Sequence, residues 1–306
     1  MLDKIYIAGQ EGMLGRAILN LFRKKKLNVL SCSRNEVDLT NQEEVLRWFK
    51  KNKPSIVINA AGRVGGILDN SIYQHDYLYI NTMIGFNLIN ASLANKVKQF
   101  INFGSACIYP RITKQPIKEN YLLSSYPETL NEGYSIAKIS TLKLCQFIKD
   151  YYKKNYVSLQ PSNLYGDGDN FNLKSSHVMP ALIRKFHEAK INNSKQVEVW
   201  GSGKAMREFL HSDDLAEAAF FCLNKNLSLA YYNVGGPDYL TIKKLANIIS
   251  SVVKYNGKIF FNTNYPDGVK KRKLDSSKFH SLGWRPKIKL IDGLKNYYKN
   301  FVKENY

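Results

Sequence analysis

Long apolar runs are missing from this sequence. None of its 306 residues lies in a stretch that approaches the roughly 20 apolar residues of a membrane span, and residues 1–7 lead into a predicted strand rather than a signal peptide. We therefore expect a cytoplasmic protein with no membrane partner. Because 44% of the residues are hydrophobic, the chain can bury a large core without a staple or a partner chain.

Cysteine is scarce as well: the chain has 4, and no two of them form a Cys-x-x-Cys pair. Their wide spacing argues against a disulfide framework and against a zinc site, and it suits a reducing compartment. We expect no bound metal. The cysteines are Cys32, Cys107, Cys145 and Cys222.

Acidic residues are outnumbered, with 25 Asp and Glu against 45 Lys and Arg and a net charge of +20. Such an excess would suit a nucleic acid. The lysines, however, lie in short separate clusters, mostly at predicted helix ends where cations suit the helix dipole. We therefore interpret them as surface charge, part of which would face an anionic nucleotide ligand, and we expect no nucleic-acid partner. The clusters are Lys24 to Lys26, Lys50 to Lys53, Lys153 with Lys154, and Lys270 to Lys273.

Apolar runs suited to buried strands alternate with helical patterns in the first half of the chain. This alternation predicts an α/β fold with a doubly wound parallel sheet of the Rossmann type. After Tyr165 the pattern changes to polar loops and shorter elements, which predicts a smaller C-terminal α/β region. We place the boundary after residue 165, with a segment near 208–235 returning to the first part. The predicted strands are Lys4 to Ala8, Asn28 to Ser31, Ile56 to Ala60, Gln99 to Phe103 and Tyr156 to Gln160.

Gly9, Gly12 and Gly15 follow the first predicted strand and open a helical pattern from Met13 to Phe22. Glycines allow a tight turn and a close approach of the backbone to a pyrophosphate, and a helix N-terminus supplies free N–H groups to the anion. The motif therefore predicts dinucleotide binding. An ordinary glycine-rich turn is the alternative.

Ser33, Arg34 and Asn35 follow the end of the second predicted strand, where NAD-dependent proteins carry an acidic residue that holds the ribose. A guanidinium pairs with the 2′-phosphate of NADP, so we expect NADP or NADPH. Glu11 in the glycine loop opposes this preference by its charge. Asp38 with Leu39, and the segment Asn59 to Gly62, have the polar and small residues of a chain that passes under adenine and ribose. Ordinary strand ends would fit the same spacing.

Tyr134 and Lys138 are four positions apart, so they project from one face of a predicted helix. A neighbouring ammonium lowers the pKa of a phenol from about 10, which suits a general acid for carbonyl reduction. In a chain with 20 tyrosines such a pair also arises by chance. Ser105 favours the catalytic interpretation because it follows a predicted strand at the sheet edge where open α/β sheets bind ligands.

A glycine loop, a Ser after a strand and a later Tyr-x-x-x-Lys form the pattern of the extended short-chain dehydrogenase/reductases. Further segments resemble the GDP-L-fucose synthase family. They are Gly12-Met13, Arg63 to Ile67, Cys107 to Pro110, Asn163 to Gly166, Asp169 to Phe171, Ser176 to Val178, Trp200 to Gly203 and Met206 to His211.

The resemblance implies an NADP-dependent oxidoreductase that reduces C4 of a GDP-4-keto-6-deoxy sugar, with C3/C5 epimerisation, for surface polysaccharide biosynthesis. Tyr134 would protonate the C4 oxygen, Lys138 would tune it and bind the cofactor ribose, and Ser105 would bond to the same oxygen. Cys107 and His177 would be the acid/base pair of the epimerisation. Taken singly, they fit a small buried residue and a helix cap.

The resemblance also implies that residues 1–165 bind NADP, that residues 166–306 mainly bind the GDP-sugar, and that the protein is a homodimer through paired helices. The substrate contacts would be Asn163, Val178, Lys185, Trp200, Arg207, Asp267 and Arg272. The cofactor contacts would be Gly9, Gln10, Glu11, Gly12, Met13, Leu14, Gly15, Arg34, Asp38, Leu39, Ala60, Ala61, Gly62, Phe103, Gly104, Ser105, Lys138, Pro161, Asn163, Leu164 and His177.

Several positions depart from the family pattern: Glu11, Arg63, Asp69, Ala106 and Lys185. A changed pocket beside an intact catalytic set suits a different sugar, so a C4 reductase of a GDP-4-keto-heptose without epimerase activity is the alternative. A non-catalytic protein, either a dinucleotide-binding regulator or a nucleic-acid binder, is a second one.

Overall fold

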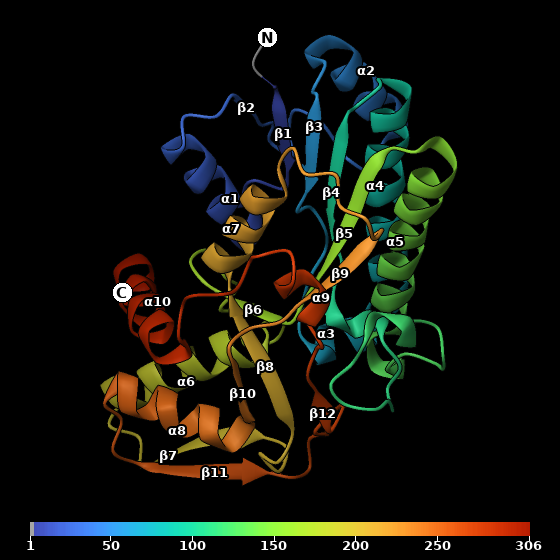
Figure 1. The fold of residues 1–306 in the computed structure, drawn as a ribbon. Coiled ribbons are helices and arrows are strands. Elements are labelled where there is room, and N and C mark those ends of the chain that lie inside the picture. Colours follow the sequence, from blue (N-terminus) through green and yellow to red (C-terminus); the bar gives the residue numbers. More distant parts are fainter. Residues whose placement is uncertain (1–2) are drawn as a thin grey trace.

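A computed structural model describes residues 3–306. Its main sheet has six strands in the order β2-β1-β3-β4-β5-β9, and every neighbouring pair is parallel (Figure 1). This confirms the predicted Rossmann-type fold. The strands are β1 (Ile5–Ala8), β2 (Val29–Leu30), β3 (Ile56–Asn59), β4 (Gln99–Phe103), β5 (Asn155–Pro161) and β9 (Tyr231–Val234).

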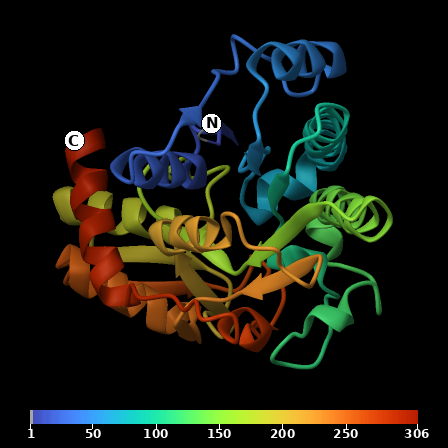
Figure 2. The same cartoon turned by 45° about the horizontal axis from the view of Figure 1, so that its top comes forward.

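Both faces of this sheet are apolar because helices cover both. Ile5 and Ile7 of β1 pack with α1 (Met13–Lys24) and α7 (Ser212–Cys222). The alternate residues Tyr6 and Ala8 pack on the other face, whose core includes residues of α2, α4 and α5. Figure 2 shows the helices on either side of the sheet. The helices on the second face are α2 (Gln42–Asn52), α4 (Gln74–Ala94) and α5 (Glu132–Tyr152).

The second region contains two small sheets. In the first, β8 (Met206–His211) pairs with β6 (Asn163–Tyr165), β10 (Asp238–Thr241) and β12 (Lys271–Arg272). In the other, β7 (Gln196–Trp200) pairs in parallel with β11 (Lys258–Asn262). Their core is shared with α6 (Val178–Ile191), α8 (Ile242–Val253) and α10 (Leu290–Asn305).

The remaining elements are short. They are the helices α3 (Ile67–Ile72) and α9 (Ser277–His280) and the 3₁₀ turns η1 (Ala106–Ile108), η2 (Glu119–Tyr121) and η3 (Thr129–Asn131). Within residues 3–306, none of the helices combines the length and the apolar character that crossing a bilayer requires.

Candidate active site

The glycine loop lies at the point where the strand order reverses, because β1 has β2 on one side and β3 on the other. Ligands of open α/β sheets bind outside the carboxyl ends of the strands at such a point. Gly9 has a φ of +81°, and a Cβ added there would lie 2.6 Å from the Cα of Ala61. Glycine is therefore required for the loops after β1 and β3 to touch.

The end of β2 is tied to this loop, since the Gln10 side-chain amide donates a 2.6 Å hydrogen bond to the Cys32 carbonyl. Arg34 follows in an exposed turn. Asp38 accepts hydrogen bonds from the backbone N–H (2.9 Å) and the hydroxyl (2.8 Å) of Thr40, and these bonds lower the pKa of its carboxyl. The Leu39 carbonyl accepts a 3.0 Å hydrogen bond from the Asn87 amide of α4.

The predicted catalytic residues meet at the carboxyl end of β4. Lys138 Nζ donates a 3.0 Å hydrogen bond to the carbonyl of Phe103, the last residue of that strand. Ser105 follows, and its Oγ accepts a 3.1 Å bond from the backbone N–H of Cys107. The Tyr134 ring lies with its centroid 5.7 Å from Lys138 Nζ.

The electrostatics of Tyr134 differ from the prediction. Burial raises the pKa of this phenol, the neighbouring Cys107 raises it further, and the hydrogen bond from Ser105 opposes the rise. Burial also lowers the pKa of Lys138 to about 8. The prediction that Lys138 acidifies Tyr134 is therefore wrong for this structure, because desolvation dominates and the ammonium bonds to the Phe103 carbonyl.

Cys107 and His177 come from different regions. Cys107 is half-buried in η1, and its carbonyl accepts a 3.0 Å bond from the Ser135 hydroxyl. His177 is the N-terminal cap residue of α6 and keeps an exposed side chain, although the surrounding protein lowers its pKa by desolvation. The loop that precedes His177 is joined to the first region by a 2.7 Å bond from the Gly66 N–H to the Ser175 carbonyl.

Two arginines of the second region lie side by side, Arg207 half-buried and Arg272 buried. Arg207 on β8 is in register with Arg272 on β12. Burial, and then the charge of Arg272, lower the pKa of Arg207 to about 10. Arg272 itself is buried and donates to the Ala106 carbonyl, next to Cys107. Two desolvated guanidiniums side by side fit an anionic group such as a diphosphate.

Two of the other predicted substrate residues, Lys185 and Asp267, lie near Trp200 or the residues that follow it. Lys185 Nζ lies 4.6 Å from the centroid of the Trp200 ring, and Tyr265 stacks on the same indole with centroids 4.4 Å apart. The Asp267 carboxylate accepts bonds of 2.7 Å from the N–H and the hydroxyl of Ser202. Asn163 donates a 2.9 Å bond to the Glu208 carbonyl, and Val178 is the first residue of α6.

Sequence reasoning missed several residues of this neighbourhood. The Asn81 side-chain amide makes two hydrogen bonds to the backbone of Arg63. Its oxygen accepts from the Arg63 N–H (3.0 Å), and its nitrogen donates to the Arg63 carbonyl (3.1 Å). The Tyr77 ring meets Tyr134 edge to face, with centroids 6.2 Å apart, and its hydroxyl donates to Asp69. A buried Asn within a largely apolar helix was the available signal for Asn81. Tyr265 carried no such signal, because it lies in a polar loop.

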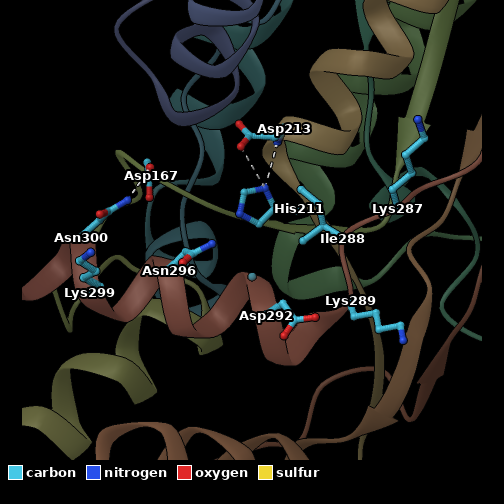
Figure 3. Close-up of a pocket in the computed structure, with 11 residues that line it drawn as sticks. Asp167, His211, Asp213, Lys287, Ile288, Lys289, Asp292, Asn296, Lys299 and Asn300 are labelled. Atoms are coloured by element: carbon cyan, nitrogen blue, oxygen red, sulfur yellow. Dashed lines mark hydrogen bonds and ion pairs between the residues drawn. The ribbon is translucent and has the colours of Figure 1, made fainter.

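A separate pocket of about 480 Å³ lies between the start of α7 and α10 (Figure 3). His211 lines it, and the ring of His211 meets Tyr165 edge to face with centroids 4.9 Å apart. Asp167, Asp213 and Asp292 add acidic groups. None of the predicted site residues lines this pocket, so its size does not mark the catalytic centre.

The six-stranded parallel sheet, the glycine loop at its switch point and the Ser, Tyr and Lys at the end of β4 define an extended short-chain dehydrogenase/reductase. The chain belongs to the NAD dependent epimerase/dehydratase family, whose profile matches residues 5–235, and within it resembles the GDP-L-fucose synthases. The "GDP-L-fucose synthase" of Sinorhizobium fredii is 43% identical over 299 residues, which are 98% of this chain and 95% of that protein.

Solved structures agree. The "GDP-6-OMe-4-keto-L-xylo-heptose reductase" from C. jejuni superposes with a TM-score of 0.92 at 35% identity, covering 99% of both chains. The "GDP-mannoheptose C4 reductase" from Campylobacter jejuni, solved with NADP bound, has a TM-score of 0.89 at 36% identity and covers 98% of both chains. The resemblance noted in the sequence is thereby confirmed.

Proposed function

We propose that this chain is a cytoplasmic, NADPH-dependent reductase that reduces the C4 ketone of a GDP-linked 4-keto sugar for surface polysaccharide biosynthesis. The observation that carries the proposal is the convergence of Ser105, Tyr134 and Lys138 at the end of β4, beside the loops after β1 and β3. Relatives named GDP-L-fucose synthase and a GDP-sugar reductase solved with NADP support the cofactor and the substrate class.

In the proposed reaction Tyr134 donates its proton to the C4 oxygen. Its raised pKa keeps the phenol protonated at neutral pH, which is the state that a general acid requires. The Ser105 hydroxyl, which lowers the pKa of the neighbouring phenol, would bond to the substrate oxygen and stabilise its developing negative charge. NADPH, when bound, supplies the hydride to C4. Lys138, fastened to the Phe103 carbonyl, would hold the cofactor ribose.

The residues that would hold the cofactor follow from the same edge of the sheet. The loop at Gly9 to Gly15 and the start of α1 would take the pyrophosphate, and Arg34 would pair with the 2′-phosphate. Residues 60–62 and Pro161 to Leu164 would complete this site. We assign NADP binding to residues 1–165 with the segment 208–235, and GDP-sugar binding mainly to residues 166–306.

For the substrate, Arg207 and Arg272 would neutralise the diphosphate. Their adjacent positions are the basis for this role, together with the burial of Arg272 and the partial burial of Arg207. Lys185 would add a further positive charge beside Trp200. Asn163, Val178 and Asp267 would contribute the remaining contacts.

Epimerisation at C3 and C5 would require proton removal and return on opposite sides of the sugar. Cys107 is contributed by the first region and His177 by the second, which suits such an arrangement. The ketone at C4 would make both neighbouring carbons acidic, and the Ser105 and Tyr134 groups that bind its oxygen would stabilise the enolate.

A second candidate is a C4 reductase of a GDP-4-keto-heptose that lacks epimerase activity. It is favoured by the similarity to two heptose reductases, at 35% and 36% identity. Asp69 and Arg63, which depart from the GDP-L-fucose synthase pattern, lie around Tyr77, whose ring contacts Tyr134. A different sugar would meet these side chains.

The proposal is tested by incubating the purified protein with NADPH and a panel of GDP-linked 4-keto-6-deoxyhexoses and 4-keto-heptoses. We expect NADPH oxidation with at least one of them, and the configuration of the product at C3, C4 and C5 identifies the reaction. If no sugar of the panel supports NADPH oxidation, a non-catalytic dinucleotide-binding protein becomes the better explanation.

We also propose a homodimer formed through α4 and α5. Large apolar side chains on these helices remain exposed in the single chain, Tyr79 at 55% and Phe147 at 58%. Pairing of two copies would bury them. Sedimentation of the protein as a monomer at micromolar concentration would contradict this assembly.

A further inference from the structure

A row of buried polar side chains crosses the main sheet beneath the catalytic residues. Asn59 on β3 donates a 3.0 Å bond to Asn102 on β4, and Asn102 donates a 2.8 Å bond to Ser158 on β5. Gln160, also on β5, donates a 2.8 Å bond to the same Ser158 hydroxyl. All four side chains are buried, with exposed fractions of 2% or less.

The row ends at the catalytic loop on one side and at a predicted cofactor loop on the other. The Gln160 side-chain oxygen accepts a 3.0 Å hydrogen bond from the backbone N–H of Ser105. At the opposite end the Asn59 side-chain oxygen accepts a 3.2 Å bond from the backbone N–H of Ala61. Both loops are thus attached to one set of side chains inside the sheet.

The approach of Gln160 to Ser105 depends on Gly104. A Cβ added at Gly104 would collide with the Gln160 amide. The Gln160 amide also has little freedom, because its oxygen bonds to Ser105 and its nitrogen to Ser158. A buried amide with both ends bonded is costly to rotate, since turning it would leave buried polar groups without partners.

From this geometry we infer that Gln160 is a positioning residue for catalysis: anchored by Ser158, it holds the backbone of Ser105 so that the Ser105 hydroxyl meets the phenol of Tyr134 and the substrate ketone. The inference deepens the proposed function and rests on it. Gln160 itself bonds to the protein and acts only through Ser105, whose Oγ is further oriented by the N–H of Cys107.

Catalysis is sensitive to such positioning, since a displacement of about 1 Å can cost on the order of 100-fold in rate. We therefore expect Gln160→Met to lower kcat by about 10-fold or more while KM and the dissociation constant of NADPH stay nearly unchanged. Ser158→Ala, which removes the anchor of the amide nitrogen, should act in the same direction. Gln160→Glu keeps an oxygen that can accept from the Ser105 N–H, and it should recover part of the lost kcat.

Gln99 provides a matched control. It is buried to a similar degree on β4, and its amide also bonds at both ends, to the Cys222 carbonyl (2.8 Å) and from the Asn224 N–H (3.0 Å). Gln99 is the first residue of β4 and Ser105 lies two positions after the last, so the control lies at the far end of the strand. Gln99→Met should destabilise the protein as Gln160→Met does and leave kcat unchanged.

A double-mutant cycle with Ser105→Ala completes the test. If Gln160 acts through Ser105, the double variant should be no slower than Ser105→Ala alone. If the fold-losses of kcat in Gln160→Met and Ser105→Ala multiply in the double variant, the inference is wrong. A normal kcat in folded Gln160→Met or Ser158→Ala would also overturn it. The two proposals fail separately: a wild-type protein inactive on the whole sugar panel contradicts the reductase, whereas an active wild type with an unaffected Gln160→Met contradicts only the positioning role.

Discussion

Lys138 donates a 3.0 Å hydrogen bond from its ammonium to the carbonyl of Phe103, so α5 is fastened to the carboxyl end of β4. The same ammonium lies near the loop after β3, since a Cβ added at Gly62 would be 3.6 Å from Lys138 Nζ. One buried charge thereby joins the helix that carries Tyr134 to the end of β4 and lies beside the loop after β3. This relationship explains how residues distant in the chain come to share one site.

Tyr134→Phe should abolish reduction and leave NADPH binding intact. The substitution removes the proton donor but keeps the ring that packs against Tyr77. We expect kcat to fall by about 100-fold or more, the usual contribution of a general acid. Steady-state turnover and NADPH fluorescence titration measure the two effects. Normal turnover in this variant would show that another group is the acid.

Arg34→Asp should shift the preference toward NADH. Arg34 lies in an exposed turn after β2, so the change costs little stability, whereas an Asp there would repel the 2′-phosphate. The ratio of kcat/KM for NADPH to that for NADH should fall by about 10-fold or more, as expected for the loss of roughly 1.4 kcal/mol of phosphate binding. Arg47→Asp, an equally exposed charge change on α2, is the control. An unaltered ratio in Arg34→Asp would place the phosphate contact elsewhere.

The pH dependence should reflect Lys138. Burial lowers the pKa of its ammonium to about 8, so the group carries its charge below that pH and loses it above. We expect kcat/KM, which reports the free enzyme, to decline as the pH rises through about 8. Tyr134 should not contribute to this decline, because burial raises its pKa.

The variant Lys138→Arg tests whether the alkaline decline of kcat/KM comes from the titration of Lys138. A guanidinium stays protonated at higher pH, so any activity that remains should keep its value through the alkaline range. A wild-type profile that stays flat well above this range, or an identical decline in Lys138→Arg, would assign the titration to another group.

Proton exchange with solvent distinguishes a reductase that also epimerises C3 and C5 from a reductase that does not. In D₂O without NADPH, an epimerase should introduce deuterium at C3 or C5 of a GDP-4-keto sugar, and Cys107→Ser or His177→Asn should slow it by about 100-fold, as expected for an acid/base residue. Nuclear magnetic resonance of the recovered sugar measures the label. C4 reduction should be less affected, since Ser105, Tyr134 and Lys138 remain. Absence of label in the wild type would identify a reductase without epimerase function.

Asp69 should influence which sugar is preferred. Its carboxylate accepts a bond from Tyr77, whose ring contacts Tyr134, so it can accept from hydroxyls of a longer sugar side chain. We expect Asp69→Ala to lower kcat/KM for a GDP-4-keto-heptose about 10-fold more than kcat/KM for a GDP-4-keto-6-deoxyhexose. A loss of this size is consistent with one lost charged hydrogen bond. Asp69→Asn, which keeps an oxygen for Tyr77, should show a smaller change. An equal loss of kcat/KM with both sugars would show that Asp69 supports the structure of the site and does not select the sugar.

Local patterns were sufficient for the architecture of the first region. The predicted strand from Gln99 to Phe103 coincides with β4, and the predicted helix from Met13 to Phe22 lies within α1. A parallel strand buried on both faces is a continuous apolar run, and this is a signal that neighbouring residues carry by themselves. The short elements of the second region have weaker signals. The pairing of Arg207 with Arg272 joins strands far apart in the chain, and no periodicity of apolar residues in the sequence predicts it.

The sequence by itself determined the sheet, the glycine loop and the residue types of the catalytic set, because each depends on spacing within one segment. Tertiary structure alone decided the ionisation of Tyr134 and the support of Ser105. The helical spacing of Lys138 suggested an acidified phenol, yet burial raises the pKa of Tyr134. Gln160 reaches Ser105 only because β4 and β5 are neighbours and Gly104 leaves room between them. Desolvation and contacts between strands depend on the folded chain as a whole, and for that reason they cannot be read from local pattern.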